Sequence, residues 1–320
     1  MGLLDAIIYY LLHKKSRYNV GMTIHHFTPD HFYNAFGSYE PVLTIASGDS
    51  VVTKTIDAGG TDDKGRKVAG SPNPQTGPFY VQDAMPGDAL LVTIDQLTSN
   101  RNDGYTTNVV AAHVVDPEFV AKLPTRARIT WQIDREKSLA TAEGQSEMAY
   151  PLSPMLGCLG VAPAGRQCIS SATSGPYGGN MDYRGLCAGV KVMFPVYEPG
   201  ALLFVGDGHA LQGDGEVVGT GIETSFDVQF TVLLLKGKKI YWPRGENADY
   251  IFTIGNVRPL EQAVQHATTE MLHWLQDDYG LSLVQASQLL GMYVTYDLGN
   301  IYDPAYTMVC KVPKKFLNRP

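Results

Sequence analysis

The sequence predicts a mainly β (α+β) protein with two helices near its C-terminus and a short helix at its N-terminus. Short runs of β-branched and apolar residues recur between residues 41 and 235, and clusters of Gly, Pro, Asn and Asp separate them. A helical spacing of apolar residues begins only after residue 259. Because no fixed-period repeat or linker interrupts the chain, we expect residues 20–320 to form one domain, preceded by a helical extension over residues 1–19.

The first residues form an apolar segment of their own. Leu3–Leu12 is apolar except for Asp5, and basic residues follow it. A secretory signal carries its basic residues before the apolar run, and ten residues are too few to span a bilayer. We therefore expect no stable membrane span but a helix that docks on the domain or on a second subunit, with a membrane-surface anchor as the alternative.

The β region contains nine predicted strands, each bounded by residues that favour turns. In two of these turns a Gly-Asp pair precedes a strand, so Asp49 and Asp88 are expected to cap backbone amides. The polar stretch Asp134–Pro154 is expected to be the loosest part of the domain. The predicted strands are Pro41–Ile45, Ser50–Ile56, Pro78–Val81, Ala89–Ile94, Arg128–Ile133, Val190–Pro195, Ala201–Val205, Val217–Ile222 and Phe226–Leu235.

Two helices and a last strand follow. Apolar residues at helical spacing predict a helix over Leu260–Gln276, which Gly280 ends. Ser282 is expected to cap a second helix that runs to about Gly291, and Tyr306–Val312 is the last predicted strand. Three polar residues of the first helix are expected on its solvated side, namely His266, Glu270 and His273.

Charge and cysteine content exclude several classes of function. A formal net charge of −7 with scattered Lys and Arg leaves no basic stripe to meet nucleic-acid phosphates. The four cysteines have no CxxC spacing, which argues against a zinc ribbon or a redox motif. Few, irregularly spaced thiols fit a reducing compartment, so we expect a cytoplasmic protein.

The segment GDGHALQGDGE gathers polar side chains where a predicted strand ends. Asp207 and His209 are two residues apart, Asp214 and Glu216 repeat that spacing, and Glu223 closes the next apolar run. Residues two apart in extended chain lie on one face, so these groups can converge. Carboxylates and imidazole bind divalent metals and transfer protons. A metal site and a solvated polar turn are both compatible with this pattern.

A second glycine-interrupted segment, GGNMD, places Asn180 and Asp182 two residues apart. No Lys-Ser/Thr pair follows, and the flanking residues favour strands, so nucleotide binding is excluded.

Together these segments resemble the acetamidase/formamidase family. The resemblance rests on five stretches in the order of the family, EPVLTIASGDSV, NPQTGPFYVQDAMPGDAL, MLGCLGVAPA, GGNMD and GDGHALQGDGEVVGTGIE. It implies the β-rich fold of that family, a homo-oligomer (dimer or trimer), hydrolysis of formamide or acetamide, and a divalent metal, zinc or calcium. Where many members have His and Asp, this chain has Tyr177 and Phe36.

The resemblance also implies site residues. Glu216 is expected to transfer a proton and Asp214 to assist, while Asn180 and Tyr177 contact the substrate. The expected metal ligands are His31, Asp182, Asp207, His209 and Glu223. Metal-activated water would then attack a small aliphatic amide. Two alternatives remain open: a C–N hydrolase of a guanidine- or urea-like compound, and a non-catalytic β module stabilised by metal.

Overall fold

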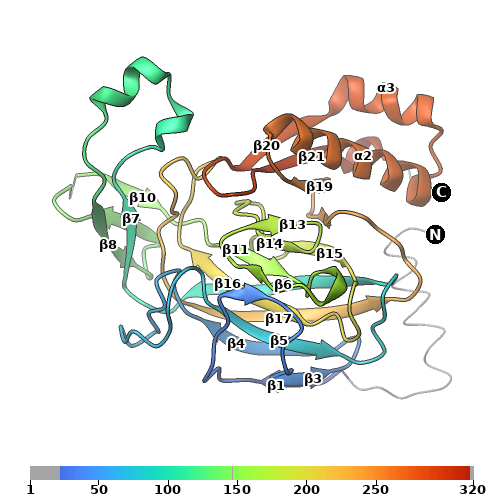
Figure 1. Ribbon diagram of the computed structural model, residues 1–320, viewed down its shortest axis with the longest axis horizontal. Helices are drawn as coiled ribbons and strands as arrows, with labels where there is room; N and C mark the ends of the chain where they lie inside the picture. The colour runs from blue at the N-terminus through green and yellow to red at the C-terminus, as the bar shows by residue number, and fades with distance from the viewer. Residues whose placement is uncertain (1–21, 146, 318–320) are drawn as a thin grey trace.

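Two large sheets stacked face to face form the body of the molecule, and two helices cover one end of the larger sheet (Figure 1). The computed structural model describes residues 22–145 and 147–317. The mainly β fold with two C-terminal helices is as predicted. The predicted N-terminal helix at Leu3–Leu12 lies outside the described residues.

The larger sheet has nine strands and is antiparallel except where its first two strands pair in parallel. Its third strand, β17, is apolar on alternate residues, which places one face of the strand in the core. In spatial order the strands are β1 (Ile24–His26), β4 (Ser50–Thr55), β17 (Phe226–Leu235), β6 (Ala89–Ser99), β15 (Lys191–Pro195), β18 (Arg244–Glu246), β19 (Tyr250–Asn256), β21 (Thr307–Pro313) and β20 (Thr295–Asn300).

The second sheet has six strands, and a two-stranded ribbon lies beside it. Its strands are β13 (Ser174–Gly175), β14 (Gly178–Asn180), β11 (Met155–Gly160), β16 (Leu203–His209), β5 (Gln75–Val81) and β3 (Leu43–Ile45), and the ribbon pairs β12 (Ile169–Ser170) with β2 (Ala35–Phe36). A main hydrophobic core fills the space between the two sheets, where for example the rings of Phe79 and Phe230 meet at 5.2 Å.

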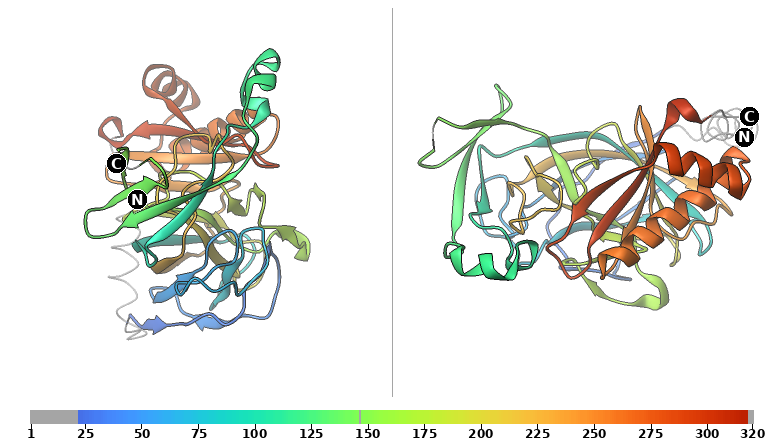
Figure 2. Two further views of the ribbon diagram at one scale, coloured as in Figure 1. Left: turned by 90° about the vertical axis from the view of Figure 1, so that its left-hand side faces the viewer. Right: turned by 90° about the horizontal axis from the view of Figure 1, so that it is seen from above.

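A four-stranded antiparallel sheet projects from the body at the end opposite the helices (Figure 2). Its strands are β10 (Ala149–Pro151), β9 (Leu139–Ala142), β8 (Arg128–Asp134) and β7 (Asp103–Thr107). The prediction of a loose stretch over Asp134–Pro154 is therefore wrong, because β9 in its middle pairs with a strand on each side. Within residues 22–145 and 147–317, the short 3₁₀ helices are Ala112–Val114, Pro117–Lys122, Ala164–Arg166 and Lys314–Phe316.

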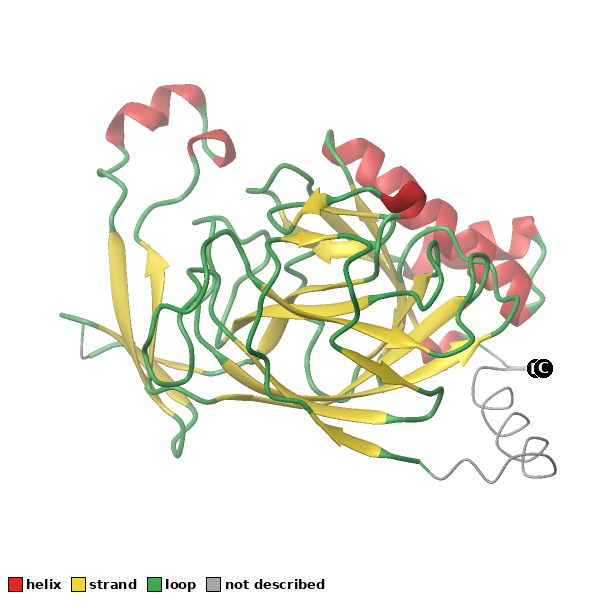
Figure 3. Cartoon of the chain, turned by 60° about the horizontal axis from the view of Figure 1, so that its bottom comes forward, coloured by secondary structure: helices red, strands yellow, loops and turns green. Residues whose placement is uncertain are grey.

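The two predicted helices are α2 (Leu260–Tyr279) and α3 (Leu283–Tyr293), which lie side by side over β19 and β21 (Figure 3). Gly280 ends α2 with a left-handed φ of 65°, and Ser282 begins α3 with a capping box to Gln285. Met271 and Trp274 anchor α2 in a second hydrophobic cluster. Among the described residues, neither helix combines the length and the hydrophobicity needed to cross a bilayer.

The prediction that three polar residues of α2 lie on its solvated side is wrong for Glu270. Its side chain is 1% exposed and accepts a hydrogen bond of 2.6 Å from Nε of the buried Arg244. The buried guanidinium supplies the partner that a buried carboxylate requires, and sequence spacing cannot reveal a partner 26 residues away.

The turns before β4 and β6 are as predicted. Asp49 accepts a hydrogen bond from the amide of Ala46, and Asp88 accepts one from the amide of Met85. The predicted strand Val217–Ile222 is wrong, however, since the chain turns there through positive φ angles of 47° at Glu216 and 71° at Gly219. A regular strand requires negative φ, so an apolar run interrupted by glycine forms a turn instead.

Candidate metal centre

Four chain segments bring one imidazole and four carboxylates together beneath the turns that follow β16. Asp207 and His209 end that strand, Asp182 follows β14, and Glu216 lies in the turn after β16. Glu223 is in an extended segment that pairs with His209. All five residues are buried, with Glu216 the most exposed at 7%.

The backbone at this cluster is strained and closely packed. Asp182, Asp207 and Glu216 have positive φ angles of 44°, 55° and 47°, which L-residues rarely adopt. Gly157 on β11 gives their side chains room, because a Cβ there would lie 2.5 Å from Asp182 Oδ1 and 2.7 Å from Asp207 Oδ2. Such strain persists only where the surrounding structure holds it, and it is concentrated at functional sites.

The orientation of His209 is fixed by Gln212. The amide nitrogen of Gln212 donates to the carbonyl oxygens of Asp182 at 2.7 Å and Gly299 at 3.4 Å, so its Oε1 faces the ring. His209 Nδ1–H therefore donates to that oxygen at 2.7 Å, and this assignment leaves a lone pair on Nε2. Support of this kind on the second ring nitrogen is usual for metal-ligating histidines.

Several buried atoms of the cluster have no hydrogen-bond partner among the described residues. They are Asp182 Oδ1, Asp207 Oδ1, His209 Nε2 and Glu223 Oε2. His209 Nε2 lies 3.0 Å from Glu223 Oε1 and 3.5 Å from Asp207 Oδ1, without the alignment of a hydrogen bond. Buried carboxylates next to a lone pair are costly unless a proton or a cation lies between them.

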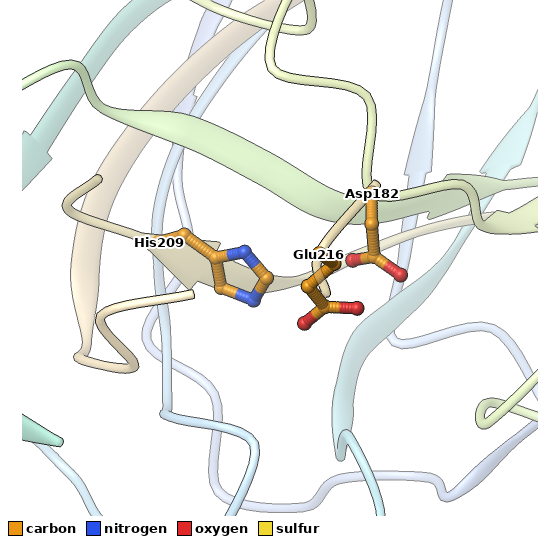
Figure 4. Close-up of side chains that lie close together, drawn as sticks. All are labelled: Asp182, His209 and Glu216. Carbon is orange, nitrogen blue, oxygen red and sulfur yellow. The ribbon is translucent and has the colours of Figure 1, made fainter. Parts of the chain in front are cut away.

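The positions of possible ligand atoms fit a cation. The sets Asp182–His209–Glu216 and Asp207–His209–Glu223 each offer one ligand atom per residue within 4.8 Å of the others. Figure 4 shows the first set, with the imidazole of His209 directed toward the two carboxylates. The described residues thus include groups able to bind a metal ion at a position buried from solvent.

Electrostatics at Asp182 and Glu216 also favour a positive charge. Burial raises the pKa of Asp182 well above its ordinary value, and the charges of Asp303 and Asp207 add to the rise. Burial, together with the charges of Asp182 and Asp303, raises the pKa of Glu216 in the same way. Without a cation these two carboxyls therefore tend to hold protons.

The pKa values of Glu223 and His209 are shifted as well. Burial raises the pKa of Glu223 to about 8, and the charge of Asp207 adds to this, while His209 opposes it. Burial alone would lower the pKa of His209, but the charges of Glu223 and Asp207 outweigh it and raise that pKa well above its ordinary value.

The fold is similar to that of a solved acetamidase from Yersinia enterocolitica. The two chains are 30% identical and superpose with a TM-score of 0.81, over 94% of this chain and 95% of that one. The chain belongs to the acetamidase/formamidase family. The predicted resemblance is thereby confirmed.

Comparisons of sequence agree with this assignment. The model of the Acetamidase/Formamidase family matches residues 165–317. The acetamidase of Mycolicibacterium smegmatis is 32% identical over 46% of this chain, and the formamidase of Methylophilus methylotrophus is 29% identical over 61%. The matched stretches span only 38% and 50% of these two relatives.

Some predicted site residues of this family member lie apart from the cluster. His31 is exposed, and its ring packs on Tyr33 at 4.6 Å. The Asp214 side chain is 41% exposed and forms an ion pair of 2.6 Å with Arg184. Neither belongs to the groups of converging ligand atoms, because the glycines on either side of Asp214 turn it outward to solvent.

The two predicted substrate-binding residues have structural contacts. Tyr177 is 3% exposed in the main core, tilted against Phe36, so the Tyr and Phe that replace the common His and Asp pack on each other. Asn180 lies beside the cluster, where its amide group donates to Asp303 at 2.5 Å and its oxygen faces Asn73 at 2.9 Å.

Sequence reasoning missed Asn300 at the end of β20. Its side-chain amide nitrogen lies 2.7 Å from Asp182, 2.8 Å from Glu216 and 2.7 Å from Asp303. Its side-chain oxygen accepts hydrogen bonds from the backbone amides of the residues two and three positions later. No signal in the spacing indicates a residue more than 80 positions from Glu216. Gln212, by contrast, is inside the predicted segment, three residues after His209, and could have been proposed.

Proposed function

We propose that this protein is a metal-dependent amidohydrolase that cleaves a small aliphatic amide, of the formamide or acetamide type, to a carboxylate and ammonia. The observation that carries the proposal is the set of four buried ligand atoms without a hydrogen-bond partner among the described residues, namely His209 Nε2 and three carboxylate oxygens. Membership of a family whose matched relatives are an acetamidase and a formamidase supports the reaction.

In this proposal Asp182, Asp207, His209 and Glu223 hold the metal. One imidazole nitrogen with several carboxylate oxygens suits zinc, and calcium, which prefers oxygen ligands, is the second candidate. When bound, such an ion acidifies water and polarises a carbonyl group.

The chain's own residues position the groups that react. Gln212 keeps the Nε2 lone pair of His209 directed into the centre. Asn300 donates to Glu216 Oε2, which leaves Oε1 free to hold a proton. Glu216 is then placed to take a proton from water and deliver it to the departing nitrogen, so that amide and water become carboxylic acid and ammonia.

We also propose that the protein is cytoplasmic and forms a homo-oligomer, a dimer or a trimer, built on one domain over residues 20–320. All four cysteines are free thiols, which suits a reducing compartment. Light scattering on the purified protein tests the subunit count.

A screen of ammonia release tests the main proposal. Formamide and acetamide are compared with urea and a guanidine compound, in protein as purified, after chelation, and after zinc or calcium is restored. We expect release from the amides, loss of that release on chelation, and its recovery with zinc. Tightly bound metal without ammonia release from any amide would instead support a metal-stabilised β module.

A further inference from the structure

Tyr105 lies in register with the candidate metal centre. Its amide donates to the carbonyl oxygen of Glu223 at 3.1 Å, and the amide of Glu223 donates back at 2.9 Å. Glu223 pairs on its other side with His209. Residues directly opposite in antiparallel segments place their side chains on the same face. Tyr105, Glu223 and His209 therefore form a row, with Tyr105 at the outer end.

The hydroxyl of Tyr105 is free to meet a ligand. It forms no hydrogen bond with any of the described residues, and Tyr105 is partly exposed while Glu223 and His209 are buried. Gly59 packs closely on one side of it, because a Cβ at that position would lie 3.1 Å from the hydroxyl and 3.2 Å from Asp57 Oδ1. The guanidinium of Arg128 covers the ring at 3.7 Å and holds it in place.

A small amide needs a donor for its carbonyl oxygen, and the cluster offers mainly acceptors. The nearby amide donors Gln212, Asn300 and Asn180 already donate to protein oxygens. A phenol has an ordinary pKa of about 10, so Tyr105 keeps its proton at neutral pH. Its hydroxyl is thus a hydrogen-bond donor beside the centre that has no acceptor among the described residues.

We propose that the Tyr105 hydroxyl binds the substrate by donating a hydrogen bond to the carbonyl oxygen of the amide. This inference rests on the proposed amidohydrolase function. It adds a residue of the projecting four-stranded sheet to the site, because Tyr105 belongs to β7.

The test is Tyr105→Phe in the zinc-loaded, full-length protein, with formamide and acetamide as substrates. We expect kcat/KM to fall about 100-fold, as on removal of one donor to a developing oxyanion, while zinc content and unfolding temperature stay unchanged. Tyr150→Phe is the matched control, because Tyr150 is in the same sheet and, among the described residues, its hydroxyl donates a hydrogen bond only to the sulfur of Met148.

The outcomes separate this inference from the function on which it rests. If the wild-type protein releases no ammonia, both are wrong. If the wild type is active and Tyr105→Phe keeps kcat/KM within twofold, only the role of Tyr105 is wrong. A loss of activity accompanied by lost zinc or a lower unfolding temperature would show that Tyr105 supports the fold, and would also overturn the inference.

Discussion

At the scale of single residues, the candidate centre depends on a glycine that is not itself a ligand. Gly157 has no positive φ, so its backbone accepts alanine, but the added methyl would meet Asp182 and Asp207 at 2.5 and 2.7 Å. Both carboxylates would have to move. We expect Gly157→Ala to weaken zinc binding by about 10- to 100-fold, the range seen when groups that support metal ligands are changed.

Calorimetric titration of the metal-free protein with zinc measures this effect. Gly70→Ala is the matched control, since a Cβ at Gly70 would meet no atom within 4 Å and its φ is ordinary. Equal zinc affinity in the two variants would mean that Asp182 and Asp207 do not bind the metal together.

Glu216 separates metal binding from proton transfer. We expect Glu216→Gln to keep its metal, because the four unpartnered ligand atoms belong to other residues. Turnover should fall by about 10²- to 10⁴-fold, the usual contribution of a positioned acid–base group. Metal content and the rate of ammonia release, measured on the same sample, check both parts. A variant that turns over normally would remove Glu216 from the proposed mechanism.

How far the centre could be predicted follows from where its residues lie. Asp207, His209 and Glu216 can be proposed from the sequence because glycines and alternating polar residues mark them within one segment. Asn300 was not found, because a polar residue gives no local sign that a distant turn places it among carboxylates. Asp214 shows the complementary difficulty, since its spacing to Glu216 repeats that of Asp207 to His209 while its side chain is 41% exposed and pairs with Arg184.

At the scale of elements, the helices were predictable because their signals are local. Apolar periodicity marks α2, and the cap residues Gly280 and Ser282 are adjacent to the helices that they bound. Strand ends were less certain. The predicted strand Ala201–Val205 is displaced, since β16 continues to His209 and thereby carries two site residues into the centre. The pairing of β16 with β11 and β5, which extends it, is a long-range property.

Two glycines near helix α3 should respond in opposite ways to alanine. Gly291 lies in the exposed helix interior with open space around it, so Gly291→Ala is expected to stabilise the protein by about 0.5–1 kcal/mol. Gly280 has a left-handed φ of 65°, so Gly280→Ala is expected to destabilise it by about 1–2 kcal/mol. Urea unfolding of both variants measures the difference, and equal shifts of either sign would refute the argument from backbone conformation.

At the scale of the whole molecule, the centre joins parts of the chain that only the tertiary structure brings together. Gly157 lies in β11 of the six-stranded sheet and Asn300 in β20 of the nine-stranded sheet, while Glu223 bridges β16 and β7, the latter in the four-stranded sheet. Composition and turn residues predicted that there would be sheets, but the order of the strands is set by packing across the core. The fold must therefore hold the buried acidic groups together, and it does so at an electrostatic cost that a bound cation would offset.

That cost predicts how stability depends on pH in the metal-free protein. The pKa of Glu223 rises from 4.5 in the ordinary state to about 8 in the folded state, so the folded protein binds this proton more tightly than the unfolded chain does. The stabilisation is fully present below pH 4.5 and is lost as pH rises toward about 8. The pKa of His209 is also raised above its ordinary 6.5, which acts in the same direction.

After chelation, we therefore expect the unfolding temperature to fall between pH 5.5 and 8.5. Zinc should reverse this trend, because the metal replaces the protons and binds better as pH rises. Glu223→Gln provides the control: without the titrating group, the metal-free variant should show a weaker dependence on pH. An unfolding temperature that rises with pH in the chelated wild-type protein would mean that the buried acidic cluster does not destabilise the metal-free fold.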